Sequence, residues 1–270
     1  MIKTPIKTQF TIFIARRRGA IVNVLTAAAA AALVWRGAAA LEYEWRWGRI
    51  PRYFLHRGAD GEWTTGPLLD GLGLTLQLSF VAGAFAVIFG MCAAAAMLGR
   101  LPSLRLFARG YATLMRGTPL LVQVYLLYFM FGNALEFNRF FAGALALALF
   151  EGAFAAEIIR AGIVAVPPGQ NEAAAALGMP RFARWRLVLL PQALPLILPP
   201  TANLFVSLIK HSSIVTIIAI ADLTDAARNI ISETFLTFEI WLTVGAMYVL
   251  VCLPPARAIA AWERRLRARR

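Results

Sequence analysis

The sequence predicts an all-α fold, a polytopic membrane helical bundle with about six transmembrane helices. Hydrophobic residues make up 60% of the 270 residues, and the mean hydropathy is +0.66. Soluble domains contain only roughly 45–50% apolar residues. The excess falls in blocks of about 20 residues, the length that crosses a hydrocarbon layer roughly 30 Å thick. The blocks are continuous, whereas a β-barrel would show short segments of alternating polarity.

The predicted spans follow these blocks in order along the chain. They cover about 20–41, 70–98, 115–132, 140–161, 193–210 and 237–256. The first is the weakest, because its alanine run adds little hydrophobicity and it contains Arg36, near an end where a long side chain can reach the interface. It is also longer than a signal-peptide core, so we expect no cleavable signal. Segment 211–236 begins with too few apolar residues to cross, which predicts a re-entrant or interfacial helix.

The distribution of basic residues predicts that both termini are cytoplasmic. With the N-terminus inside, four inner segments hold 19 of the 27 Lys and Arg residues, and three outer segments hold six. The inner segments are 1–19, 99–116, 160–186 and 257–270, and the outer segments are 42–69, 133–139 and 211–236. This asymmetry is typical of a multi-pass protein of the cytoplasmic (inner) membrane. The net charge of +13 is therefore interpreted as an orientation signal in a lipid-embedded protein, with no nucleic-acid partner.

The cysteines and histidines are too few and too scattered to form a site. Cys92 and Cys252 lie in separate hydrophobic blocks, and His56 and His211 are isolated. We therefore expect no disulfide framework, no metal site and no catalytic residues. A membrane-embedded enzyme would need a convergent set of such groups at membrane depth, so this class ranks last.

The loop between the fourth and fifth spans predicts a compact helix–turn–helix on the cytoplasmic face. It reads PPGQNEAAAALGMPRFARWRLVLLP at 167–191. Its opening PPG is expected to end the preceding helix, and Glu172 to stand in the first turn of the next, where the helix dipole favours an acid. Gly178 suits the C-cap position, and a second short helix is expected at about 181–190, closed by Pro191. The small residues would let a partner protein approach closely, whereas DNA is excluded by the flanking spans.

This loop resembles the EAA motif of permease subunits of ATP-binding-cassette importers. The matching residues are Glu172, Ala173, Ala174, Gly178, Val188, Leu190 and Pro191, with valine where the pattern has isoleucine. Further stretches resemble the polar amino acid branch of that family, namely GLGLTLQLSF at 71–80, MRGTPLLVQVYLLYF at 115–129, AAEIIRAGI at 155–163 and LPPTANLFVSLIKHSS at 198–213. At His211 the family often has an acidic or amide residue. The likeness covers about 70–258.

The resemblance implies a transport subunit that moves a polar amino acid by alternating access. It implies ATPase subunits that grip the loop as a coupling helix, a second permease copy or a paralogue, and an extracytoplasmic substrate-binding protein. It also implies a permease core at 70–258, preceded by an N-terminal tail, an added helix and an outer loop at 1–69 and followed by a basic tail at 259–270.

The residues themselves predict that ATP binds elsewhere and that this chain has no cofactor. A phosphate-binding loop of the Walker A type needs glycine before its lysine. Lys3, Lys7 and Lys210 all follow isoleucine. The alternative, an ATP-independent secondary transporter or channel for small polar solutes, leaves the helical loop without a role.

Polar residues at membrane depth are candidates for the substrate pathway. Glu151 lies midway along the fourth span, where an ionised side chain costs about 2.5–3.5 kcal/mol. We hypothesise that it offers a carboxylate to the substrate's ammonium or cationic side chain; the alternative is a pair across helices. Gln123, Asn203 and Ser207 are candidates for the same cavity, with interhelical hydrogen bonds as the alternative. Asn203 and Ser207 share a helix face because they are four residues apart.

Two further expectations concern the inner halves of the spans. Glu157 and Arg160 are three residues apart on one helix and are expected to pair with each other. Pro195, Pro199 and Pro200 are expected to break or kink the entrance of the fifth span.

Overall fold

The structure is a computed structural model that describes residues 22, 24–26, 28–29, 32–33, 35–37, 43–57, 61–132 and 136–267. The chain divides into two compact units, Met1–Trp45 and Arg46–Arg270. In the first unit the described residues between 22 and 37 are helical. The N-terminal tail at 1–19, much of the predicted first span at 20–41 and the last residues of the basic tail lie outside the described residues.

The second unit consists almost entirely of helices. The elements of its described part are the 3-10 helix η1 (Trp47–Tyr53), strands β1 (Leu55–Arg57) and β2 (Trp63–Thr65), helices α2 (Pro67–Leu98), α3 (Pro102–Gly117) and α4 (Leu120–Tyr125), the π-helix η2 (Leu126–Gly132), helices α6 (Arg139–Val164), α7 (Pro168–Ala176) and α8 (Arg181–Arg184), the π-helix η3 (Trp185–Leu189), helix α9 (Leu190–His211), the 3-10 helix η4 (Ser212–Ile218), and helices α10 (Leu223–Thr234) and α11 (Thr237–Arg267). The two strands are antiparallel, with His56 opposite Thr64.

Four predicted spans correspond to apolar helices of this unit, and a fifth corresponds to a bent pair of helices. Helices α2 and α6 and the stretches Arg181–Ile218 and Thr237–Arg265 are each long and apolar enough to cross a membrane. Helix α3 together with α4 and η2 would add one more, bent by 108°. The all-α membrane bundle is therefore confirmed, with four or five of about six expected spans found among the described residues.

The predicted third span, 115–132, differs most from the structure. Its first residues end α3, and the chain turns sharply before α4 begins. Thr118 is extended, with φ −118° and ψ 147°, because the ring of the following Pro119 disfavours helical backbone at the residue before it. The span is therefore a broken one, with α3 packed against α2 and α6.

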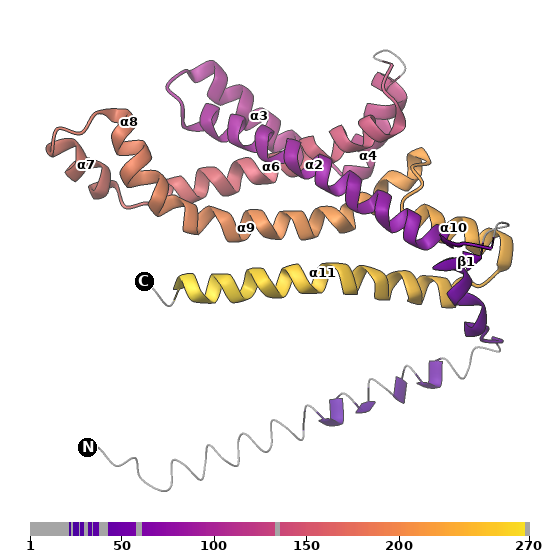
Figure 1. Cartoon of the computed structure of the whole chain (residues 1–270). Helices are drawn as coiled ribbons and strands as arrows, with labels where there is room; N and C mark the ends of the chain where they lie inside the picture. Colours follow the sequence, from indigo (N-terminus) through magenta and orange to yellow (C-terminus); the bar gives the residue numbers. More distant parts are fainter. Residues whose placement is uncertain are drawn as a thin grey trace, which may run out of the picture. The chain divides into compact units, whose positions relative to one another are not determined.

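Helices α2 and α6 form the centre of the bundle and pack along their lengths (Figure 1). Small residues allow this close approach. A Cβ atom added to Gly90 would lie 2.6 Å from the Cβ atom of Ala155. Ala155 and Ala156 are almost fully buried. Helices in lipid associate through such backbone contacts, since apolar burial gives little driving force there.

Helix α9 is not broken at its entrance, although a break was one of the two outcomes expected of its prolines. It runs through Pro195, Pro199 and Pro200 without interruption, and α8, η3 and α9 follow one another directly. Pro191 does not close a helix as expected. It stands in the first turn of α9, where its missing N–H costs little, after a π-helical turn in which Leu190 N donates to Trp185 O.

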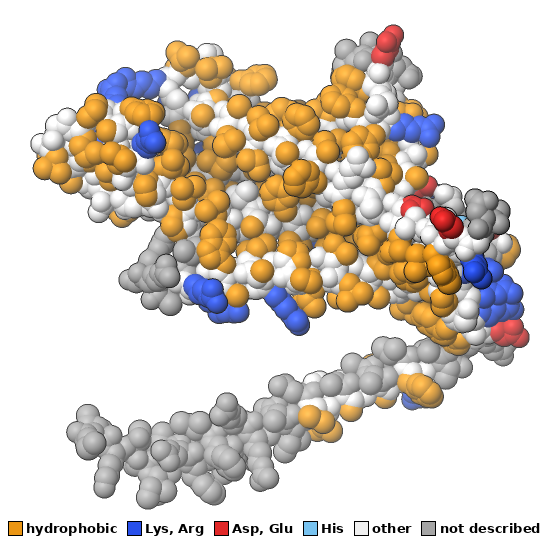
Figure 2. All heavy atoms as spheres, viewed as in Figure 1, with side chains coloured by type: hydrophobic (Ala, Val, Ile, Leu, Met, Phe, Trp, Pro, Cys, Tyr) orange, Lys and Arg blue, Asp and Glu red, His pale blue; other side chains and the backbone are white. Residues whose placement is uncertain are grey.

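The two ends of the bundle are formed by different short elements. Helices α7 and α8 form one end, and α10 and the strands form the other (Figure 1). Side chains on the visible face of the bundle between these ends are mainly hydrophobic (Figure 2). Helix α10, with twelve residues, is too short to span a membrane, so segment 211–236 contains short helices, as predicted.

Asp222 fixes the start of α10 and is fully buried. Its Oδ1 accepts a hydrogen bond from Asp225 N at 2.9 Å, whereas its Oδ2 is buried without a partner. The next residue, Leu223, donates its N–H to Thr75 Oγ1 of α2 at 3.0 Å. Burial raises the pKa of the Asp222 carboxyl from an ordinary 3.8 to about 6.

Asp222→Asn is expected to keep this cap and to reduce the dependence of stability on pH. The pKa of Asp222 is higher in the folded protein than in the unfolded chain. The stability that the protonated carboxyl contributes is therefore fully present below about pH 4 and is lost as the pH rises through about 6. Near neutral pH the asparagine variant should be more stable by roughly 1–3 kcal/mol. Thermal unfolding of the purified protein from about pH 5 to about pH 8 measures this difference. Asp222→Ala, which lacks a cap, should be less stable than Asp222→Asn throughout, and identical pH profiles for wild type and Asp222→Asn would contradict the argument.

Candidate coupling loop and transport pathway

The expected helix–turn–helix is present as α7 and α8 with a tight turn between them. Gly178 has φ +75°, a conformation that L side chains rarely adopt. Met179 N donates to Ala174 O at 3.1 Å, and Gly178 N donates to Ala175 O at 3.0 Å. This pair of bonds ends α7 with a left-handed glycine, which is a common helix stop.

Helix α7 begins earlier than the sequence suggested. It starts at Pro168, because proline suits the first helical position and Pro167 is extended. Glu172 therefore lies in the middle of α7 and not in its first turn, so the argument from the helix dipole does not apply to it. Its side chain is exposed.

The residues of the EAA motif occupy both surfaces of the loop. Ala174 is buried, Val188 and Leu190 are half-buried, and the other four (Glu172, Ala173, Gly178 and Pro191) are exposed. Polar contacts join the two arms of the loop: Arg184 Nη1 donates to Asn171 Oδ1 at 3.3 Å, and Gln192 Nε2 donates to Gln170 Oε1 at 3.3 Å. At the base, Val166, Ala193 and Ile197 form an apolar cluster. These contacts hold the two arms of the loop together and attach the loop to α6 and α9.

Sequence reasoning missed the apolar tip of this loop. Leu177 is 82% exposed, Phe182 75% and Leu187 64%. Large apolar side chains on a polar loop mark surfaces that bind another protein. The sequence could have indicated this exposure, because the three residues lie on either side of Gly178 in a loop too short to bury them. We call Leu177, Phe182 and Leu187 the loop tip.

Glu151 pairs with His211 across two helices, which is the alternative that the sequence left open. The Glu151 Oε1 atom lies 2.6 Å from His211 Nδ1. The Glu151 side chain is 2% exposed, whereas that of His211 is 41% exposed. Phe150 meets the imidazole edge-on, with ring centroids 5.9 Å apart. In this conformation His211 therefore covers the carboxylate.

Gln123 braces the bend between α3 and α4. Its Nε2 donates to Met115 O at 2.8 Å and to Thr118 Oγ1 at 2.8 Å. Its Oε1 is buried without a partner. The residue also lines an apolar hollow of about 370 Å³. Its hydrogen bonds join it to the bend, and none joins it to Glu151, Asn203 or Ser207.

Asn203 and Ser207 belong to a longer polar face of α9. Lys210 and His211 follow at helical spacing, so all four side chains lie on one side of the helix. Among the described residues, Asn203, Ser207 and Lys210 have no side-chain hydrogen bond or ion pair. We call these four residues the α9 polar stripe. The sequence signal was present, since the spacing of four that joins Asn203 to Ser207 continues to His211.

Glu157 forms the expected pair with Arg160. Arg160 Nη2 lies 2.8 Å from Glu157 Oε2, and Arg116 Nη1 of α3 lies 3.7 Å from Glu157 Oε1. The Arg116 guanidinium also stands 5.4 Å from the centroid of the Phe154 ring. These charges tie α3 to α6 and are not free for a substrate.

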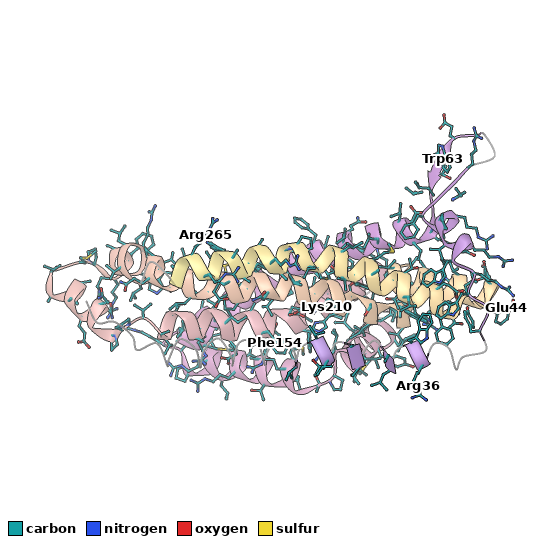
Figure 3. The ribbon with its side chains drawn as sticks, turned by 90° about the horizontal axis from the view of Figure 1, so that it is seen from below. Arg36, Glu44, Trp63, Phe154, Lys210 and Arg265 are labelled. Atoms are coloured by element: carbon teal, nitrogen blue, oxygen red, sulfur yellow. The ribbon has the colours of Figure 1, made fainter. Side chains whose placement is uncertain are left out.

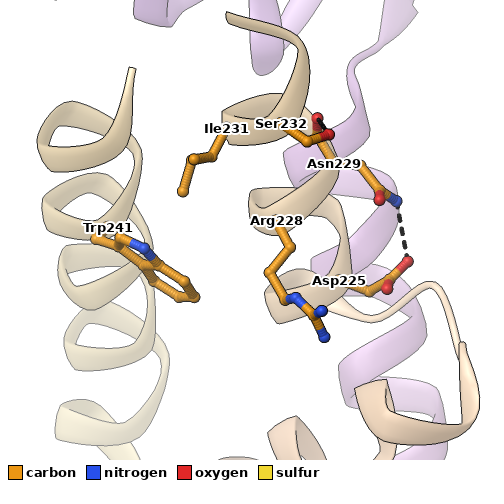
Figure 4. Close-up of a pocket in the computed structure, with 6 residues that line it drawn as sticks. All are labelled: Asp225, Arg228, Asn229, Ile231, Ser232 and Trp241. Atoms are coloured by element: carbon orange, nitrogen blue, oxygen red, sulfur yellow. Dashed lines mark hydrogen bonds between the residues drawn. The ribbon is translucent and has the colours of Figure 1, made fainter. Parts of the chain in front are cut away.

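The far end of the bundle carries a polar hollow between α10 and α11 (Figure 4). Its volume is about 350 Å³. Asn229 Nδ2 donates to Asp225 Oδ2 at 3.1 Å, and the indole of Trp241 faces the hollow from α11. Its lining residues are Asp225, Arg228, Asn229, Ile231, Ser232 and Trp241.

A bundle of apolar helices with a compact helical loop at one end and polar residues half-way along is typical of a membrane transport protein. Residues 86–268 match the family model described as the binding-protein-dependent transport system inner membrane component. The chain belongs to this family and is a permease of the ATP-binding-cassette importer type.

Named relatives agree with this assignment. The chain is 38% identical to a Rickettsia felis protein named as a glutamine transport system permease, over 69% of this chain and 87% of that protein. It is 35% identical to an octopine transport system permease of Rhizobium radiobacter, over 73% of this chain and 84% of that protein. It is 34% identical to an arginine transport system permease of Bacillus subtilis, over 74% of this chain and 93% of that protein.

Solved structures show the same fold. A crystal structure of an amino acid ABC transporter with histidines has a TM-score of 0.69 and 41% identity, covering 74% of this chain and 94% of that chain. An inward-facing methionine ABC transporter has a TM-score of 0.65 and 19% identity, covering 74% of this chain and 96% of that chain. At this identity the likeness supports the fold alone.

Proposed function

We propose that this chain carries a polar amino acid across the cytoplasmic membrane by alternating access, driven by ATP hydrolysis on separate subunits. The observation that carries the proposal is the coupling loop. A rigid helix pair that keeps the EAA motif presents an exposed apolar tip, formed by Leu177, Phe182 and Leu187, where no part of the described chain covers it. Such a tip suits insertion into a groove of a motor protein.

The proposal implies an assembly with defined ends. Two ATPase subunits bind the coupling loop on the cytoplasmic side, where both termini also lie, and a second permease copy or a paralogue completes the pathway. A substrate-binding protein delivers the amino acid at the opposite end, where Asp225 and Arg228 line a polar hollow. The permease core is placed at 70–258. ATP hydrolysis is assigned to the partner subunits, since none of this chain's lysines stands in a phosphate-binding loop.

Glu151, Gln123, Asn203 and Ser207 are proposed to belong to the pathway in different ways. Asn203 and Ser207 contribute directly through the α9 polar stripe, which cannot face lipid without cost. Gln123 fixes the bend beside the pathway. Glu151 acts through His211, whose ring it holds at 2.6 Å, and is a positioning residue.

Glu151→Leu is expected to reduce uptake by about tenfold or more, because His211 then loses a charge-assisted contact worth roughly 1.5–3 kcal/mol. Glu151→Gln, which keeps an acceptor oxygen, should lose less. ATP-dependent uptake in proteoliposomes measures both variants. Glu233→Gln, an exposed acid on α10, is the matched control. Wild-type uptake by Glu151→Leu would exclude Glu151 from the pathway.

Reconstitution tests the function as a whole. The chain, its ATPase subunits and its binding protein are placed in liposomes, and labelled amino acids are offered with and without ATP. Uptake that requires both ATP and the ATPase subunits is the expected result. Uptake by the chain alone would instead establish an ATP-independent transporter or channel.

A further inference from the structure

The end of the bundle opposite the coupling loop carries an apolar hollow that the proposed transport function does not use. The hollow has a volume of about 550 Å³ and lies between η1 and the hairpin of β1 and β2. Both elements precede the part of the chain that matches the family model. Ile50 of η1 is buried in one apolar cluster with Leu68 of α2 and Ile240 of α11, which fixes this segment to the bundle. The lining residues are Trp47, Ile50, Pro51, Phe54, Leu55 and Trp63.

The register of the hairpin places an arginine beside this hollow. Arg57 is paired with Trp63, and Leu55 lies two residues before Arg57 on the same strand. Side chains alternate between the two faces of a strand, and directly opposite residues of an antiparallel pair share a face. Arg57 therefore lies on the same face as Leu55 and Trp63, which line the hollow. The opposite face is polar, with His56 Nε2 and Thr64 Oγ1 3.1 Å apart.

The charged side chains of this segment are basic. Residues 46–57 contain four arginines and no aspartate or glutamate. Arg57 Nε donates to Gly61 O at 2.9 Å, and the other N–H groups of its guanidinium have no partner within the described part of the chain. Arg49 is exposed and has no side-chain hydrogen bond or ion pair there. Arginine stays charged and can hold a phosphate through two parallel N–H groups. The hollow and its arginines therefore complement a molecule that is anionic at one end and apolar at the other.

This surface lies at the depth of lipid headgroups. Helix α2 begins directly after β2 and has 32 residues, so it is roughly 48 Å long at the usual helical rise. A bilayer with its headgroup layers is about 40–45 Å thick, so both ends of α2 reach a headgroup layer. The hairpin that carries Trp63 projects sideways from the long axis of the bundle and so extends along the membrane surface (Figure 3). Trp63 is 72% exposed, and tryptophan is enriched in this layer.

We infer that η1 and the hairpin bind an anionic phospholipid, whose phosphate contacts Arg57 and whose glycerol and upper acyl chains fill the hollow beside Trp47 and Trp63. The other arginines of 46–57 favour a lipid with a net negative charge over a zwitterionic one. A soluble partner would approach the end of the bundle from the water, whereas the hairpin extends along the membrane, which favours lipid over protein as the occupant. The site requires only that the bundle spans a membrane, and it is independent of the solute that the permease carries.

Native mass spectrometry of the purified full chain measures the affinity of the first lipid that binds. The probes are phosphatidylglycerol and phosphatidylcholine with identical acyl chains. Wild type should bind phosphatidylglycerol about tenfold more tightly, the scale of one charge-assisted contact. Arg57→Gln should remove most of this preference, because the choline group already compensates the phosphate of phosphatidylcholine and that lipid loses less. Arg57→Lys should keep part of the preference, since it retains the charge without the guanidinium fork.

A second variant separates the apolar contact from the charge. Trp63→Ala removes a contact made to either lipid, so it should weaken the binding of both by a similar factor and leave the preference unchanged. Thr64→Ala on the opposite face of the hairpin and Arg257→Gln on an exposed position of α11 are the matched controls, and both should bind as wild type does. A single symmetrical peak in size-exclusion chromatography shows that each variant is folded.

Photo-crosslinking locates the lipid in the membrane. The full chain is placed in nanodiscs with a phosphatidylglycerol that carries a photoreactive group near the glycerol end of one acyl chain. Crosslinks should fall within 47–57 or 63–65 and should decrease in Arg57→Gln.

Four results would overturn the lipid site. They are equal affinity of wild type for the two lipids, an unchanged preference in Arg57→Gln, lipid crosslinks confined to other segments, and crosslinks of this segment to a substrate-binding protein and not to lipid when both are present. The last result would make the surface a protein contact. ATP-dependent uptake is a separate measurement, so failure of the lipid site would leave the proposed function standing.

Discussion

Replacing Glu172 with lysine is expected to abolish ATP-driven uptake while the chain still inserts into the membrane. Glu172 is exposed in the middle of α7 and has no side-chain hydrogen bond or ion pair within the described chain, so its loss should not unfold the loop. In the proposed assembly this carboxylate meets the ATPase subunit. A reversed charge at a docked surface costs several kcal/mol through like-charge contacts and unpaired groups.

Two measurements check this expectation. Co-purification of the ATPase subunits with Glu172→Lys should be lost, or ATP hydrolysis should continue without uptake. Glu172→Gln should have a smaller effect, and Glu233→Lys on α10 should have none on co-purification. Normal uptake by Glu172→Lys would remove Glu172 from the coupling contact.

Gly90→Leu is expected to prevent α2 and α6 from packing. Even a Cβ atom at this position would lie 2.6 Å from Ala155 Cβ and 3.2 Å from the backbone N of Ala156. Backbone cannot yield as a flexible side chain does, so the helices must separate. Overpacking of this kind costs about 1–3 kcal/mol and more where backbone is struck. We therefore expect most of the protein to be lost from the membrane fraction.

A matched substitution on the same helix isolates the cause. Gly73 is exposed on α2, and a Cβ atom there meets nothing within 4 Å. Gly73→Leu should therefore accumulate normally, as measured by size-exclusion chromatography of fluorescent fusions. Gly90→Ala combined with Ala155→Gly should recover much of the loss of Gly90→Ala. Equal yields of Gly90→Leu and Gly73→Leu would show that α2 and α6 can separate without harm.

The sequence predicted the membrane helices well because hydrophobic length is a local property. Spans at 70–98, 140–161, 193–210 and 237–256 all correspond to apolar helices. The prolines were harder to interpret. Pro119 breaks a span, whereas Pro195 and its neighbours do not break α9, and only the surrounding structure distinguishes the two cases. Likewise, Pro168, which was expected to help end the preceding helix, instead begins α7.

The pathway was less accessible to sequence reasoning because its contacts are long-range. Glu151 and His211 are 60 residues apart, and no spacing rule joins them. Polarity at membrane depth identified Glu151, Asn203 and Ser207 as candidates but left the role of His211 open. The exposure of the loop tip was equally hidden, since a motif shows which residues match and not which of them are uncovered.

The continuous helical path of α8, η3 and α9 joins the proposed ATPase contact to the polar residues half-way along the bundle. The residues from Arg181 to His211 are helical without a gap, although α8 is angled relative to α9 (Figure 1). In the proposed assembly, a displacement of Phe182 would therefore be passed toward α9 through continuous helical backbone. The π-helical turn at Trp185–Leu189 lies between the loop and α9, so converting it to regular α-helix is expected to change how much of that displacement α9 receives.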